Sequence, residues 1–198
     1  MFGIVNSDEY LNQTRGTWKT KAVFYIGAAA IVGILSGTLL GLLGAYVTIE
    51  IRAASAVLAA SAGIVIGAFE LWRRPVRVIQ INRETPQSWM RSGALAWATR
   101  NGAVLGLGAT TRIGFWLWYS IPLGSFLVGS PAVGAAIYGT YSVVRAAWAI
   151  ALIVLGSPNR TGSGRLADWL TSRIGTARTV SAAHMLALGI ALSLHTTF

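Results

Sequence analysis

Five apolar stretches long enough to cross a lipid bilayer recur along the chain, and they constrain its fold more than any other feature. A helix needs about 20 apolar residues to cross the hydrocarbon core. Only 11% of the residues are charged, whereas soluble domains carry roughly 25%. We therefore expect an all-α, polytopic membrane helix bundle in which residues 1–198 form a single integral membrane domain. The expected spans are residues 22–49, 53–72, 101–128, 132–155 and 179–197.

The positive charges predict the orientation of these spans. Thirteen of the sixteen Lys and Arg residues lie in the N-terminal segment 1–21 and in the linkers 73–100 and 156–178. Five crossings place these segments on one side and Arg52 on the other, so the basic side is expected to be cytoplasmic. We expect the N-terminus inside and the C-terminus outside, in a plasma or inner membrane. A cleavable signal peptide is not expected, because 21 mostly polar residues precede the first apolar run.

Small residues at helical spacing predict where the spans pack. Gly33, Gly37 and Gly41 recur every four residues in the first span, and Gly63 and Gly67 do so in the second. Such ridges let a neighbouring helix approach closely. We expect the bundle to contact membrane lipids and to form a homo-oligomer or to join other membrane subunits.

The turns are predicted less directly. Glu50 and Arg52 are expected to mark the turn between the first two spans. Glycines at 106, 108 and 114 and Pro122 predict that the third span is broken or kinked.

Two arginines lie where an apolar span should hold no charge. Arg112 and Arg145 are each eleven residues from the cytoplasmic end of their span, about 17 Å into the membrane. A charge there costs roughly 3 kcal/mol or more, so both should face protein, water or a partner. They would bind an anionic ligand in a cavity, meet an acid or lipid phosphate from another molecule, or be satisfied by backbone carbonyls and by hydroxyls such as Thr110, Thr111 and Ser142. The sequence leaves these three alternatives open.

Other ionisable residues in the spans are few. Glu70 is the only acid within a span, near its cytoplasmic end, and its simplest partners are Arg73 and Arg74 at helical spacing. His184 and His195 lie eleven residues apart in the last span, about 16 Å along a helix axis, which is too far to share a metal ion.

No pattern of enzyme chemistry is present in the sequence. It contains no nucleophile elbow, zinc-protease motif or phosphate-binding loop, and its six acids include no pair within a span. The absence of cysteine excludes disulfides and thiolate metal sites formed by this chain. The net charge of +10 is explained by cytoplasmic loops and not by nucleic-acid binding, for which no motif is found. We expect a non-enzymatic protein without metal or cofactor.

Three segments resemble the cytochrome c biogenesis transmembrane family of thiol–disulfide electron carriers. They are the third span, NGAVLGLGATTRIGF, the fourth, GAAIYGTYSVVRA, and the last, RTVSAAHMLALGIALSL. The resemblance implies a helical scaffold with broken helices. That family works through a pair of intramembrane cysteines, which this chain lacks, so the electron-carrier activity is not implied.

Two hypotheses of function follow. In the first, the protein is a transporter- or channel-like component that binds or passes a small, anionic solute along Arg112 and Arg145. In the second, it is a structural or accessory subunit of a larger membrane complex. Its Gly- and Ala-rich helix faces and buried arginines would then contact other subunits or lipid.

Overall fold

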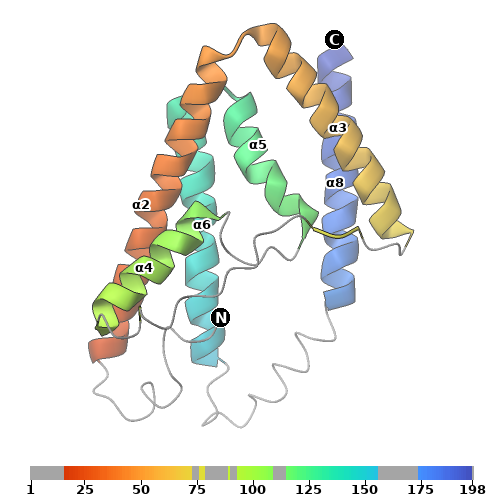
Figure 1. Cartoon of the computed structure of the whole chain (residues 1–198). Helices are drawn as coiled ribbons and strands as arrows, with labels where there is room; N and C mark the ends of the chain where they lie inside the picture. Colours follow the sequence, from red (N-terminus) through yellow and green to blue (C-terminus); the bar gives the residue numbers. More distant parts are fainter. Residues whose placement is uncertain are drawn as a thin grey trace. The chain divides into compact units, whose positions relative to one another are not determined.

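The computed structural model shows helices joined by turns and short segments (Figure 1). It describes residues 16–72, 76–78, 89, 93–108, 115–155 and 174–197. No residue in these ranges belongs to a β-strand, which confirms the all-α prediction for the described part of the chain. The helices are α2 (Gly16–Tyr46), α3 (Ile49–Leu71), α4 (Ala94–Leu107), the short 3-10 helix η2 (Trp116–Tyr119), α5 (Ser120–Leu127), α6 (Pro131–Leu155) and α8 (Ile174–Thr197).

Among the helices that the structure describes, two are long and apolar enough to cross a membrane. They are the stretch Trp18–Tyr46 of α2 and the whole of α3, Ile49–Leu71. By their length and composition, each of these two helices could cross a bilayer.

The turn predicted at Glu50 and Arg52 is wrong. Helix α2 ends at Tyr46, and Thr48 takes an extended backbone (φ −62°, ψ 155°) before α3 begins. Glu50 and Arg52 therefore lie within α3. The physical reason is that a carboxylate is favourable in the first turn of a helix, where Glu50 lies.

The predicted third span, residues 101–128, is not one helix among the residues that the structure describes. Helix α4 begins at Ala94, so Trp97 and Arg100 belong to it and not to a linker. It ends at Leu107, and the chain is next described at Phe115, in an extended conformation before η2. The break predicted from the glycines is confirmed. Helix α8 begins at Ile174, five residues before the predicted last span, which starts at residue 179.

The chain forms two compact units, each assembled from three separate stretches. Unit 1 contains residues 1–36, 81–112 and 139–172, and unit 2 contains residues 37–80, 113–138 and 173–198. Helices α2 and α6 contribute residues to both units.

Unit 1 is held together by close contact between α2 and α4, which cross in Figure 1. A Cβ atom placed on Gly102 would collide with the carbonyl of Tyr25, and one on Gly106 with that of Ala29. The two helices run parallel, because the residue numbers of the contacting pairs increase in the same direction along both helices. The buried core of the unit is small: Tyr25, Ala29, Ala98, Leu105 and Ala146.

Unit 2 is built around the antiparallel pair α3 and α8, which lie side by side in Figure 1. Gly67 lies against α8 so closely that a Cβ atom would be 2.8 Å from the carbonyl oxygen of Ala182. In the reverse direction, a Cβ on Gly189 would be 2.7 Å from the carbonyl oxygen of Ala60. Small residues on both helices thus bring the two backbones into contact.

The ridge in α2 packs on the start of α6. Gly37 and Gly134 face each other backbone to backbone, and Gly41 lies against the carbonyl of Ser130. Gly33 is also buried. Within unit 2, the end of α2 and the start of α6 therefore form a second antiparallel contact made by small residues.

Candidate functional site

The end of α4 is the first component of the candidate site. Gly108 closes the helix with a positive φ of 75°, and its N–H donates to the carbonyl of Leu105 at 3.1 Å. Glycine accepts this left-handed conformation without steric cost. A helix that stops inside an apolar sequence leaves backbone carbonyls to be satisfied by other groups. One of them, the carbonyl of Gly106, accepts a hydrogen bond from the buried hydroxyl of Ser142 on α6 at 3.4 Å.

Arg145 lies one helical turn beyond Ser142 on α6 and is half-buried, with its Nη1 atom shielded from solvent. Its guanidinium is 5.8 Å from the ring centroid of Tyr141, within the range of a cation–π interaction. The charge of Arg145 also interacts electrostatically with the buried Tyr25 of α2. Helices α2, α4 and α6 of unit 1 thus bring the guanidinium of Arg145, the hydroxyls of Tyr25, Tyr141 and Ser142, and the end of α4 into one region.

The other residues predicted for this site lie outside the described residues. These are Thr110, Thr111 and Arg112, which follow the end of α4 in the sequence. Their roles therefore stay predictions.

Unit 2 contains a charged pair that sequence analysis assigned to other partners. The side chain of Glu70 is only 2% exposed, and its Oε1 lies 3.9 Å from Nε of Arg178 on α8. The predicted partners, Arg73 and Arg74, lie outside the described residues. The pairing with Arg178 could not be predicted, because the residues around Glu70 give no information about a partner more than 100 positions away in the sequence.

The histidine of α8 that the structure describes is engaged locally. The ring Nδ1 of His184 is 2.8 Å from the carbonyl of Val180, one turn earlier, and the side chain is exposed. The side chain of His195 lies outside the described residues. Among the described side chains, no three His, Asp or Glu residues gather as a metal site would require.

The aromatic residues that follow the break in the third span pack on one another. The rings of Trp116 and Trp118 lie 5.3 and 5.1 Å from that of Tyr119. The indole N–H of Trp116 also donates to the carbonyl of Val76 at 3.2 Å, which attaches residues 76–78 to η2 within unit 2.

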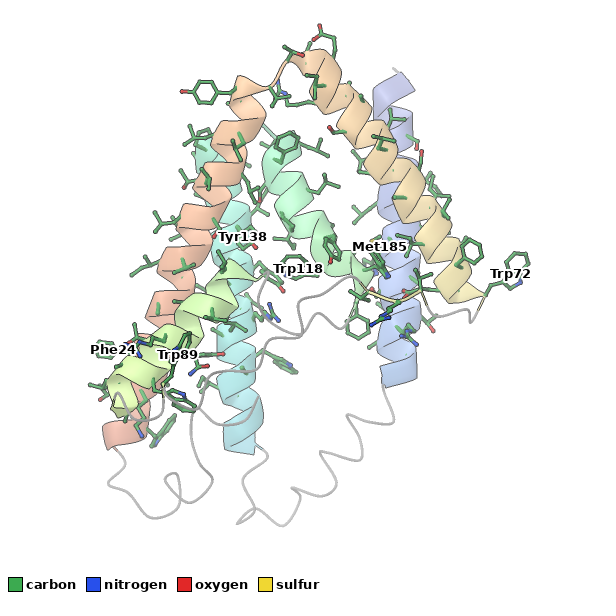
Figure 2. The ribbon with its side chains drawn as sticks, viewed as in Figure 1. Phe24, Trp72, Trp89, Trp118, Tyr138 and Met185 are labelled. Atoms are coloured by element: carbon green, nitrogen blue, oxygen red, sulfur yellow. The ribbon has the colours of Figure 1, made fainter. Side chains whose placement is uncertain are left out.

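Two aromatic residues of unit 1 differ in their surroundings. Figure 2 shows Phe24 pointing away from α2, whereas Trp89 lies by α4, where Arg100 is 5.8 Å from its ring centroid. Phe24 is exposed, as expected of a side chain that faces lipid or another subunit.

Comparison of the chain with protein-family models, with curated proteins and with solved structures finds no match.

Proposed function

We propose that the protein is a small multi-pass membrane protein that binds or passes a small anionic solute at Arg145. The membrane location is supported by the surface of the two most apolar helices. Their most apolar 18-residue windows are only 22% buried in α2 and 28% buried in α3. The core helix of a soluble protein would be mostly buried, so these surfaces need lipid or other subunits to cover them.

The exposed apolar side chains of α2 form a stripe. Ile31, Leu35 and Leu39 follow one another at intervals of four residues, and all three are exposed. Residues at this spacing lie on one face of a helix. The proposed arrangement is the five-span bundle with the N-terminus inside, as the distribution of positive charge predicts.

The observation that carries the anion proposal is the set of donors beside the end of α4. Arg145 offers guanidinium N–H groups, and Tyr25 and Tyr141 offer hydroxyls, from two helices in one unit. Guanidinium and hydroxyl groups are the donors that bind carboxylate or phosphate oxygens. Membrane transporters place their solute sites where a helix is interrupted. In the same proposal Arg112, with Thr110 and Thr111, extends this site.

Anion flux into proteoliposomes tests the proposal. Chloride, nitrate, acetate and phosphate are offered to vesicles that contain the wild-type chain, Arg145→Gln or Arg145→Lys. Loss of a charge-assisted hydrogen bond lowers affinity by about 10- to 100-fold, so Arg145→Gln should abolish flux of the transported anion at low concentration, and Arg145→Lys should retain part of it. Arg100→Gln is the matched control, because Arg100 is an exposed arginine of the same unit, and it should leave flux unchanged.

The second candidate is an accessory subunit of a membrane complex, and the exposed stripe on α2 favours it. In this case the stripe and the small-residue faces contact other chains. Purification in mild detergent then yields the protein together with stoichiometric partners, and vesicles that contain the chain alone carry none of the four anions. That result would refute the transport proposal.

A further inference from the structure

Glu70 is a buried carboxyl group that the anion proposal does not use. It lies one turn beyond Gly67 on the face of α3 that packs on α8. Among the described residues the charged group near it is Arg178, and their 3.9 Å separation exceeds a hydrogen bond. The other oxygen, Oε2, is buried and has no hydrogen-bond partner among the described residues. A carboxylate with so few donors is expensive to bury.

The contact between α3 and α8 buries a second polar atom. The hydroxyl Oγ of Ser181 is buried on α8 and has no hydrogen-bond partner among the described residues. Ser181 lies one turn after Arg178, next to Ala182, which contacts Gly67. Neither Ser181 Oγ nor Glu70 Oε2 has a hydrogen-bond partner among the described residues, so the hydroxyl does not satisfy the carboxyl group. A proton on the carboxyl group would remove the charge that is costly to bury there.

We propose that Glu70 is a proton-binding site inside the α3–α8 pair, which holds a proton on its buried carboxyl group and releases it when Arg178 compensates the charge. The proposal is independent of anion binding at Arg145, since it uses residues of unit 2 alone.

The surrounding charges are few. Helix α5, which contacts α3, carries no titratable side chain, and η2, which contacts α8, carries Tyr119. The segment 76–78 carries Arg77, which is exposed, and His184 of α8 is exposed and bonded within its own helix. Arg178 is thus the charged side chain that the structure places against Glu70.

Labelling with dicyclohexylcarbodiimide tests the proposal on the full chain in detergent or liposomes. The carboxyl proton moves to a nitrogen of the carbodiimide while the carboxylate oxygen bonds to its central carbon. The product rearranges to an N-acylurea that contains all atoms of both reactants. An apolar carbodiimide needs a protonated carboxyl in an apolar place, so peptide mass spectrometry should find the label on Glu70 and its yield should fall as the pH is raised. Glu50, exposed at the other end of α3, is the internal control and should stay unlabelled.

Variants give the expected directions. Glu70→Gln should abolish the label and Glu50→Gln should leave it. Arg178→Gln removes the compensating charge and should raise the pH at which labelling is half-maximal. Each variant is compared by helical circular dichroism and by gel-filtration elution, so that a misfolded chain is recognised.

Three outcomes would overturn the proposal. The first is a well-folded protein with no label on Glu70 at any pH. The second is an equal label on Glu50 and Glu70. The third is protection of Glu70 by sodium chloride at constant pH and constant ionic strength, which would show a bound metal cation in place of the proton.

Discussion

The contact between α3 and α8 predicts how much a single methyl group costs at Gly67. A Cβ there would lie 2.8 Å from the carbonyl oxygen of Ala182 and 3.0 Å from the backbone nitrogen of Leu186. Ordinary van der Waals contact begins at 3.4 Å, so the helices must separate by about 0.6 Å. The obstructing atoms are backbone atoms, which a change of rotamer does not move.

The free energy follows from two opposing effects of Gly67→Ala. Overpacking a close contact costs about 1–3 kcal/mol, and replacing glycine inside a helix returns about 1 kcal/mol. We expect a net loss of up to about 2 kcal/mol for Gly67→Ala. At Gly63 the nearest atom to an added Cβ would be the carbonyl oxygen of Met185, 3.2 Å away. The backbone of α8 therefore has to move much less, and Gly63→Ala should leave the free energy of unfolding almost unchanged.

The assay is unfolding of the purified chain in one detergent, followed by helical circular dichroism. Gly27→Ala is the matched control, because nothing lies within 4 Å of the added Cβ, and it should be stabilising by about 0.5–1 kcal/mol. The expected order of stability is Gly27→Ala, wild type or Gly63→Ala, then Gly67→Ala. A Gly67→Ala protein at least as stable as the Gly63→Ala protein would refute the close backbone contact between α3 and α8.

Two further predictions concern the turns and the membrane. Gly129 has a φ of +60°, so Gly129→Ala should cost about 1–2 kcal/mol in the same unfolding assay. The new Cβ would also contact the guanidinium of Arg52, but this should add little because the end of that side chain can move. A Gly129→Ala protein as stable as wild type would contradict the left-handed turn. The chain contains no cysteine, so single cysteines report topology without background: Thr48→Cys and Ser130→Cys should react with an impermeant maleimide from outside intact cells, and Ser163→Cys only after permeabilisation. Labelling of all three from the same side would contradict the proposed orientation.

The helical class could be predicted from the sequence because apolar runs of this length need internally bonded backbone. The break in the third span could also be predicted, since glycine is favourable where a helix must end at Gly108. The start of α3 was predicted in the wrong place, although Thr48 followed by Glu50 is a recognisable helix start. The charges of Glu50 and Arg52 were interpreted as a turn between two spans, but Glu and Arg are good helix formers and both lie in α3.

Helix partners could not be predicted. Gly63 and Gly67 indicate a close contact, but small residues occur in every apolar stretch of the chain and do not specify which helix makes it. The pairing of Glu70 with Arg178 depends on that choice, so it too was missed. The surroundings of Arg145 could be anticipated only as alternatives, because whether hydroxyls approach it depends on how α2 and α6 pack.

The antiparallel pairing of α3 with α8 has a consequence for the time course of biosynthesis. About 100 residues separate the end of α3 from the start of α8, and a ribosome needs roughly 5–20 s to add them at about 5–20 residues per second. During that interval the small-residue face of α3 and the carboxyl group of Glu70 have been synthesised while their partner has not. For those seconds the small-residue face of α3 must be covered by something other than α8, which covers it in the finished protein.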